Sequence, residues 1–120
     1  MRLLAFCLVV VVAFAAATGE SAAGTVRCSS DIVADNEDGR LGCRDQVRGK
    51  RRVTYDFGSC TRPQDFEAQT ADDFAFGKRR GRKVLLRSDA IKVTVTLRRH
   101  GIVVRNHRRN AVRMFWTIAC

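Results

Sequence analysis

Alternating apolar positions in residues 91–120 constrain the fold more than any other feature of the sequence. Apolar side chains occupy the odd positions of residues 91–97 and the even positions of residues 112–118, and a short apolar run at residues 102–104 lies between these segments. A period of two is typical of a β-strand that buries one face. We therefore expect three strands laid back and forth, joined by polar turns.

Two earlier segments, residues 25–28 and 53–57, also predict strands because they are rich in β-branched and aromatic residues. We expect Tyr55 and Phe57 from the second segment to pack against Trp116 in the core, since a lone Trp among alternating apolar positions is usually buried. The alternative is that Trp116 is an exposed platform on which a sugar or a base stacks.

The middle of the chain allows a helix or a hairpin. Residues 61–70 have the features of a short helix, since Thr61 suits the N-cap and acidic residues follow it. Residues 74–76 either extend the apolar face of that helix or pair as a strand with residues 84–86, which makes residues 77–83 an exposed hairpin tip. With at most one short helix, the expected fold class is mainly β, a small antiparallel β-sandwich or meander.

The N-terminus has the pattern of a secretory signal peptide. Arg2 precedes an apolar run too short to span a bilayer, and residues 15–17 fit a small-x-small cleavage site. A cut after Ala23 and an uncleaved N-terminal anchor are the alternatives, and no later apolar run approaches membrane length. The expected organisation is a signal peptide at residues 1–17, a flexible tail at residues 18–24 and a single domain at residues 25–120.

Four cysteines remain after the predicted cleavage: Cys28, Cys43, Cys60 and Cys120. An even number in a small secreted domain predicts two disulfides, with three pairings open. Each bridge is expected to contribute about 2–4 kcal/mol of stability. No CxxC pair occurs, and neither His has a cysteine nearby in sequence, so the chain predicts no metal site and no cofactor.

Charge is distributed unevenly along the chain. Residues 18–76 contain 8 Lys and Arg against 11 Asp and Glu, a net charge of −3, whereas residues 77–120 contain 13 Lys and Arg against one acid, a net charge of +12. Such a split indicates an anionic partner for the second half. A GC-rich coding bias is the alternative source of the many arginines.

The densest basic segment is residues 78–83, which contain Gly81 and directly follow Gly77. Its charges favour a site for nucleic acid, sulfated glycan or anionic lipid. The segment also resembles a nuclear-localisation signal and, like residues 50–52, a dibasic processing site. A solvated basic loop is the remaining alternative. The surrounding half adds further arginines, some of them in two turns at opposite ends of a predicted strand, and together they predict a basic stripe along one face. These arginines are Arg98, Arg99, Arg105, Arg108, Arg109 and Arg113. The residues expected to bind the partner are Lys78, Arg79, Arg80, Arg82, Lys83, Arg98, Arg99, Arg108 and Arg109.

Catalysis has little support in the sequence. His100 and His107 fall at opposite ends of a predicted strand, and seven residues at about 3.3 Å each separate them by roughly 20 Å. An acid and a base that act on one phosphodiester must both lie within hydrogen-bond reach of it. We therefore predict no catalytic residues and no enzyme, with a secreted nuclease as an alternative.

The signal peptide, the four mature cysteines, the single β-rich domain and the lack of catalytic motifs give the chain a resemblance of class. It resembles the small secreted cysteine-containing effectors of plant-pathogenic fungi and fungal killer toxins. The resemblance covers the whole chain and transfers no functional residues. It implies a protein that acts outside its producing cell by binding a host protein or an anionic surface. We therefore expect a secreted, extracellular monomer whose partner is a host or target-cell protein, or an anionic polymer or surface. Nucleic acid as the partner and entry into a host cell are further options. The alternative is a cationic toxin or antimicrobial protein that acts on an anionic membrane or wall.

Overall fold

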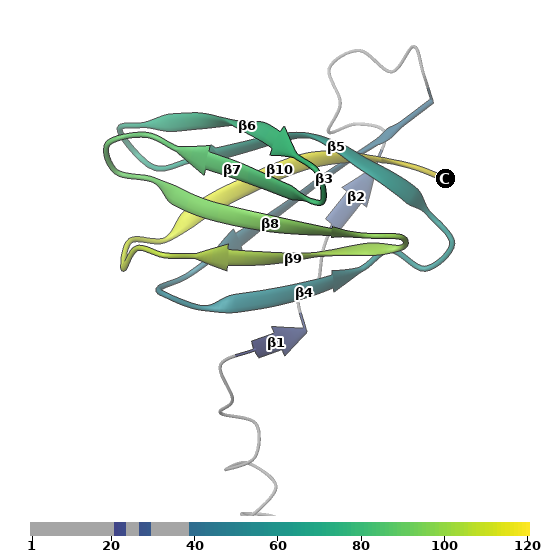
Figure 1. The fold of residues 1–120 in the computed structure, drawn as a ribbon, viewed down its shortest axis with the longest axis horizontal. Coiled ribbons are helices and arrows are strands. Elements are labelled where there is room, and N and C mark those ends of the chain that lie inside the picture. Colours follow the sequence, from purple (N-terminus) through teal and green to yellow (C-terminus); the bar gives the residue numbers. More distant parts are fainter. Residues whose placement is uncertain (1–20, 24–26, 30–38) are drawn as a thin grey trace, which may run out of the picture.

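The computed structural model describes residues 21–23, 27–29 and 39–120, and these residues form strands and turns without any helix (Figure 1). The predicted signal peptide, residues 1–17, lies outside the described residues. Three residues of the segment expected as a flexible tail form a short strand. In chain order the strands are β1 (Ser21–Ala23), β2 (Arg27–Ser29), β3 (Leu41–Val47), β4 (Arg52–Asp56), β5 (Thr61–Gln69), β6 (Phe74–Arg80), β7 (Lys83–Arg87), β8 (Lys92–Arg98), β9 (Gly101–Asn106) and β10 (Val112–Ala119).

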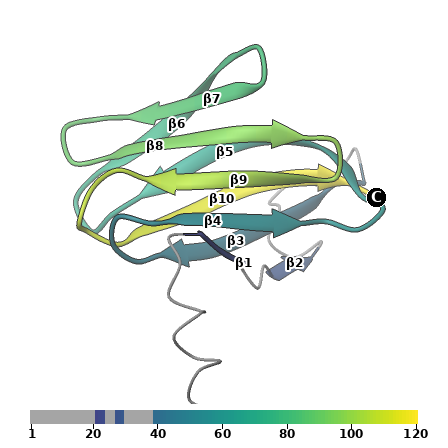
Figure 2. The same ribbon diagram turned by 60° about the horizontal axis from the view of Figure 1, so that its bottom comes forward.

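The strands form one sheet that curls into two layers, in the order β1-β4-β9-β8-β7-β6-β5-β10-β3-β2 (Figures 1 and 2). The curl passes through β6, because residues 77–80 pair with β7 and residues 74–76 pair with β5. We call β1, β4, β9, β8, β7 and the second half of β6 the front layer. The first half of β6 with β5, β10, β3 and β2 forms the back layer. Neighbouring strands are antiparallel except for β1, which is parallel to β4.

The core lies between the two layers and is centred on Trp116, as the sequence predicted. Trp116 is 1% exposed, and its ring centroid lies 5.2 Å from that of Tyr55 and 6.2 Å from that of Phe57. Phe66 from β5 adds a third aromatic neighbour at 6.5 Å. Tyr55 belongs to the front layer and Trp116 to the back layer, so this cluster joins the two.

The predicted register of β8 is confirmed. Val93 and Val95 are fully buried. Thr94 and Thr96, which alternate with them, point to the opposite side of the sheet and are half-buried. Val95 lies beside the fully buried Val104 of β9. The front layer therefore has one face in the core and one face directed outward.

The meander predicted for residues 91–120 is wrong at its last strand. β8 and β9 form a hairpin, but β10 crosses to the back layer and pairs with β3 and β5. The other edge of β9 is covered by β4, where Arg52 lies opposite Arg105. Alternation specifies which face of a strand is buried but not which strand lies beside it.

The short helix predicted for residues 61–70 is also wrong, because these residues form β5. Arg62 and Asp65 have positive φ values of 54° and 56°, and the pairing with β10 shifts register twice. A bulge of this kind breaks the alternation of a strand. Pro63 and Phe66 are therefore both buried although they are three residues apart, a spacing that imitates a helix.

The predicted hairpin is present, but its expected register is wrong, because residues 74–76 pair with β5 and residues 77–80 take their place opposite β7. β6 and β7 pair up to Arg80 and Lys83, and the turn contains Gly81 with a φ of 59°. Gly77 marks the place where β6 passes from the back layer to the front layer. A Cβ at Gly77 would lie 2.5 Å from Val84 Cγ1, so only glycine lets the two strands of the hairpin approach this closely.

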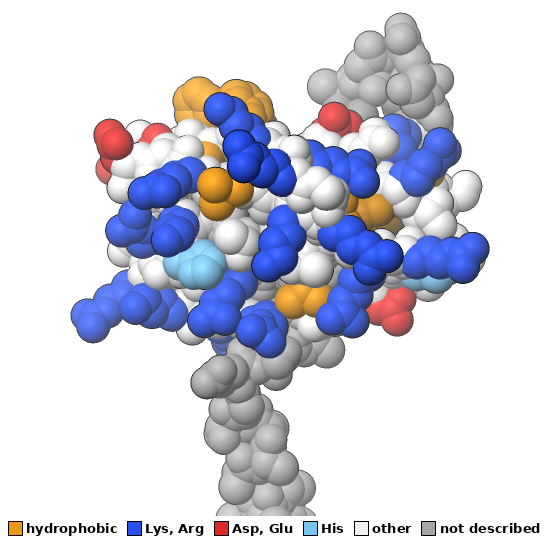
Figure 3. Space-filling model, viewed as in Figure 1, with side chains coloured by type: hydrophobic (Ala, Val, Ile, Leu, Met, Phe, Trp, Pro, Cys, Tyr) orange, Lys and Arg blue, Asp and Glu red, His pale blue; other side chains and the backbone are white. Residues whose placement is uncertain are grey.

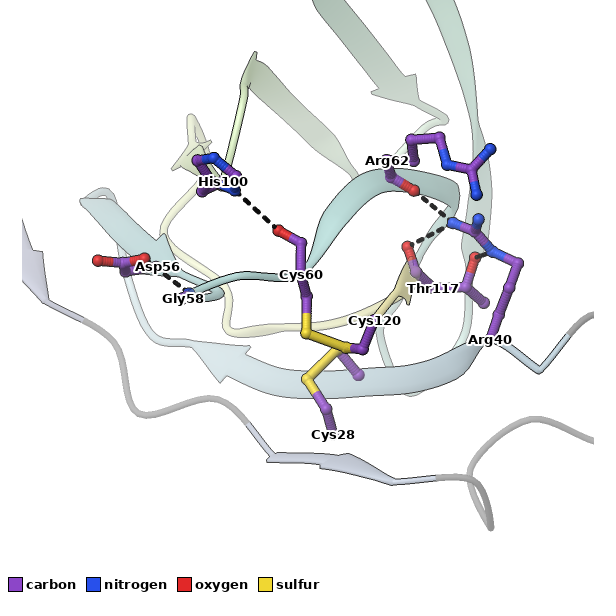
Figure 4. Close-up of a disulfide and its surroundings, with 10 residues drawn as sticks. Cys28, Arg40, Asp56, Gly58, Cys60, Arg62, His100, Thr117 and Cys120 are labelled. Carbon is purple, nitrogen blue, oxygen red and sulfur yellow. Dashed lines mark hydrogen bonds between the residues drawn. A yellow bond between two sulfur atoms is a disulfide. The ribbon is translucent and has the colours of Figure 1, made fainter.

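Two disulfides join the predicted cysteines. Cys28 in β2 is bonded to Cys43 in β3, and Cys60 before β5 is bonded to Cys120 (Figure 4). Close to the second bridge, His100 lies 3.3 Å from the Cys60 carbonyl oxygen through its Nδ1 atom. The bridges therefore fasten the edge strand β2 and the end of the central back-layer strand β10.

Removal of either disulfide by paired Cys→Ala substitution tests how the bridges stabilise the fold. The two closed loops differ, with sequence separations of 15 for Cys28–Cys43 and 60 for Cys60–Cys120. Because a longer loop restricts the unfolded chain more, we expect losses of about 3 and about 4 kcal/mol in the free energy of unfolding, respectively. Urea unfolding, monitored by the fluorescence of Trp116, measures both losses. A larger loss for the shorter loop would contradict this explanation.

Among the described strands, β4 and β3 lie on the two sides of a seam and are not paired with each other. Side chains bridge this seam instead. The Tyr55 hydroxyl donates a hydrogen bond to an Asp45 carboxylate oxygen. At one end of the sheet, the buried Asn106 side chain of β9 joins two connections, since it donates to the carbonyl oxygens of Gly49 in the β3–β4 connection at 3.0 Å and of Asn110 in the β9–β10 connection at 2.9 Å.

Tyr55→Phe tests the contribution of this seam to stability. The substitution keeps the ring against Trp116 and removes only the donor to Asp45. We expect the free energy of unfolding to fall by about 1.5–3 kcal/mol, the range for a lost hydrogen bond to a charged group. The same substitution in an Asp45→Ala background should cost less. An equal cost in both backgrounds, measured by urea unfolding, would show that the hydrogen bond does not stabilise the fold.

Candidate functional site

The outward side of the front layer is strongly basic. Along β4, β9, β8, β7 and β6, the positions that alternate with the buried residues carry eight Lys and Arg side chains, with Thr, Val and Leu between them, and Asp56 is the only carboxylate in these strand positions. We call this surface the basic face, and Figure 3 shows Lys and Arg side chains spread over it. Its cations are Arg52, Lys78, Arg80, Lys83, Arg87, Lys92, Arg98 and Arg105.

Cross-strand pairing aligns the residues of the basic face in rows. One row, from β4 to β6, consists of Arg52, Arg105, Thr94, Leu85 and Lys78. The next row consists of Thr54, Val103, Thr96, Lys83 and Arg80. Because paired strands lie about 4.8 Å apart, a row of five residues extends over roughly 20 Å. The basic face is therefore longer than a small metabolite.

A groove with a volume of about 490 Å³ lies in the middle of the basic face. Short side chains from three neighbouring strands leave this hollow, and longer basic side chains border it. The groove combines hydroxyl groups with cations, which are the groups that bind phosphate, sulfate and carboxylate oxygens. Its lining residues are Arg52, Thr54, Lys83, Thr94, Thr96, Arg98, Val103, Arg105 and His107.

The structure brings some of the predicted binding residues together on the basic face and places others beside it. Lys78, Arg80 and Lys83 lie on the face near the β6–β7 turn, whereas Arg82 lies in the turn itself. Arg79 points to the opposite side of β6, and its Nε–H donates to the Gly81 carbonyl oxygen at 3.0 Å. The dense basic segment therefore contributes to two sides of β6 rather than to one tip.

The remaining predicted residues lie at the two ends of the β8–β9 hairpin. Arg98 ends β8 on the basic face, and Arg99 follows it in the turn to β9. Arg108 and Arg109 lie in the crossing segment between β9 and β10, at the other end of β9. The charges thus extend along the strands as well as across them, in the arrangement expected of a stripe.

Sequence reasoning missed Arg52, Arg87 and Lys92 as members of the basic face. Arg52 lies in the acidic half of the chain, so the charge split directed attention away from it. The phase of its strand was nevertheless informative, because the buried Val53 and Tyr55 require Arg52 to point outward. Assigning each cation to a face would have been a better guide than its position along the chain.

His107 borders one end of the groove. Its Nε2 atom lies 3.0 Å from the Thr94 hydroxyl oxygen, which holds the ring over β8. Partial burial lowers the pKa of His107 below its usual value, and neighbouring positive charges lower it further. These charges belong to Arg105, Lys92, Arg108 and Lys50. The ring is therefore neutral near pH 7 in the free protein.

The back layer presents a different outward surface. Asp65 and Glu67 from β5 line a small hollow there, together with Phe115 from β10. Arg44 and Arg113 lie on the same side of β3 and β10, and both are exposed. The excess of positive charge that the sequence shows in its second half is thus concentrated on the front of the molecule.

Other kinds of site are not seen in the part of the chain that the structure describes. His100 and His107 lie at opposite ends of β9. No group of three or more His, Cys, Asp or Glu side chains among these residues is placed to hold a metal ion. Within the same residues, no helix has the length and apolar character needed to cross a membrane.

No protein-family model matches the chain, and neither a curated protein nor a solved structure matches it.

The lowered pKa of His107 predicts opposite effects of acid on stability and on anion binding. The unfolded chain takes up a proton at a higher pH than the folded protein, so the free energy of unfolding should fall as the pH drops through about 6.5. A polyanion in the groove favours the imidazolium form, so its affinity should rise over the same range. Titration of heparin binding and urea unfolding against pH measures both trends. His107→Gln should reduce both, whereas His100→Gln should retain them; equal behaviour of the two variants would contradict the assignment.

Proposed function

We propose that this chain is a secreted, non-enzymatic binding protein whose basic face binds an anionic polymer or surface of a host or target cell. The observation that carries the proposal is the concentration of cations on one outward sheet face, with Asp56 as its only carboxylate. Two disulfides fit a protein that works outside the cytosol.

The composition of the basic face favours oxyanions as ligands. Its arginines offer planar forks of N–H donors that match phosphate, sulfate and carboxylate groups. Thr94 and Thr96 supply hydroxyl groups between the cations, in the lining of the groove. A partner with repeated anionic groups can occupy several of these positions at once.

The dimensions of the face favour a polymer or a surface over a small metabolite. Cations are present on every strand from β4 to β6 in sheet order, and the groove lies between them. A small anion would use only a few of these charges. Within the rows, Arg52 lies one strand spacing of about 4.8 Å from Arg105, and Lys83 lies the same distance from Arg80, which suits a chain of repeated charges.

The positions of the histidines favour binding over hydrolysis. His107 borders the groove, but His100 lies at the far end of β9, where its Nδ1 contacts the Cys60 carbonyl oxygen. A nuclease that uses an acid and a base needs both groups at one phosphodiester. Binding without chemistry requires neither.

Neutralising two cations of the basic face and two of the back layer separates specific binding from net charge. Lys83→Gln/Arg105→Gln removes two positive charges from the groove, and Arg44→Gln/Arg113→Gln removes the same charge from the opposite face. We expect the first pair to weaken heparin binding at least tenfold and to reduce the slope of log affinity against log salt by about 2. The second pair should change both quantities much less.

Folding should survive all four substitutions, because exposed charges contribute little to stability. Equal loss of heparin affinity in the two double variants would show that net charge alone determines retention. Unchanged affinity in the first pair would overturn the proposal that the basic face is the binding surface.

A further inference from the structure

Two exposed aromatic rings adjoin the basic face. Phe74 is 58% exposed and Phe76 is 64% exposed, although large apolar side chains elsewhere in the described chain are mostly buried. The two rings are in an edge-to-face arrangement with centroids 5.4 Å apart. Leu85, which is 40% exposed, is the third large apolar residue exposed in the described part of the chain.

The rings continue the basic face along β6. Phe74, Phe76, Lys78 and Arg80 occupy alternate positions of this strand and point to the same side. Leu85 lies directly opposite Lys78 on β7 and so connects the apolar side chains with the basic rows. Figure 3 shows hydrophobic side chains over β6 at the upper edge of this view, with basic side chains next to them.

We infer that the polymer bound by the basic face is a single-stranded nucleic acid, whose bases stack on Phe74 and Phe76 while its phosphates lie along the cationic rows. The inference rests on the proposed function and specifies its ligand. Exposed aromatic rings beside a positively charged groove are the two elements that sequence-tolerant single-strand binding requires. Stacking needs only the flat face of a base, so a pair of Phe rings is sufficient.

The charges around the rings favour bases over lipid headgroups. Glu67 lies opposite Phe76 on β5, and Asp73 directly precedes Phe74. An anionic membrane that received the two rings would bring its headgroups against these carboxylates. A single strand avoids this repulsion, because its neutral bases cover the rings and its phosphates lie toward Lys78 and Arg80.

A second copy of the chain and a sulfated glycan fit the surface less well. Two copies joined through Phe74 and Phe76 would place two basic faces side by side, which opposes association. A sulfated glycan would satisfy the cations, but its sugar rings would contact the Phe rings only through C–H groups and not through a flat π-face as a base does. Nucleic acid uses both parts of the surface.

Phe74→Ala/Phe76→Ala tests the inference, with Leu85→Ala as the matched control. The control also shortens an exposed apolar side chain at the same surface but removes no ring. Fluorescence anisotropy with labelled oligothymidylate and oligouridylate measures single-strand affinity at fixed salt, and heparin binding reports the charges alone. We expect the double Phe variant to bind the oligonucleotides roughly 5- to 160-fold more weakly, the range for loss of one stacked base, with heparin affinity unchanged. Leu85→Ala should lose less than threefold.

A third variant, Phe74→Tyr/Phe76→Tyr, should restore oligonucleotide binding, since it restores the rings. Failure of the double Ala variant to weaken oligonucleotide binding, or equal loss of heparin binding, would overturn the inference but leave the proposed function intact. Loss of vesicle binding, measured with phosphatidylserine vesicles, without loss of oligonucleotide binding would assign the rings to a membrane instead. Absence of binding to both heparin and oligonucleotides by the unsubstituted protein would overturn the proposed function itself.

Discussion

The packing of Trp116 between the layers is the interaction on which the remaining structure depends. Within the described sheet, β4 and β3 are not paired, so no ladder of backbone hydrogen bonds joins the front layer to the back layer at this seam. Trp116 from the back layer contacts Tyr55 and Phe57 from the front layer and closes the curl through side chains. Its Nε1–H is buried without a hydrogen-bond partner in the described chain, a cost that the burial of three aromatic neighbours must offset.

The curl also determines what the outer surfaces can do. Because the front layer buries every second residue against the back layer, the alternate residues are fixed in rows on the outside. The hairpin of β8 and β9 lies in the middle of this surface and carries threonines rather than long side chains there. Cations can therefore border a groove instead of filling it. The basic face is a consequence of sheet register combined with short central side chains.

The sequence was informative where alternation is regular and uninformative where it is broken. The buried faces of β8 and β10 and the pairing of Tyr55 and Phe57 with Trp116 follow directly from the pattern. β3 was not predicted, because Asp45 interrupts the inward apolar positions of this strand. Only the distant Tyr55 hydroxyl explains how a carboxylate is tolerated at that position.

The neighbours of each strand were harder to predict than the strands themselves. The bulges of β5 imitate helical spacing, and the crossing of β10 to the back layer depends on packing that no local pattern contains. The binding surface was predicted only in part for the same reason. Lys78, Arg80 and Lys83 are close in sequence, whereas Arg52 joins them only through β9, β8 and β7.

The central place of β10 in the back layer has a consequence for how the protein folds. β3 and β5 lie on either side of β10 and are not paired with each other, so the back layer has no continuous ladder until residues 112–119 are in place. The front-layer strands β6, β7, β8 and β9 are instead consecutive in the chain and can pair as successive hairpins. Contacts between distant residues form slowly, because their loop-closure entropy must be overcome first. During this delay the edges of β3 and β5 are open to other chains, so the yield of refolding should depend on protein concentration.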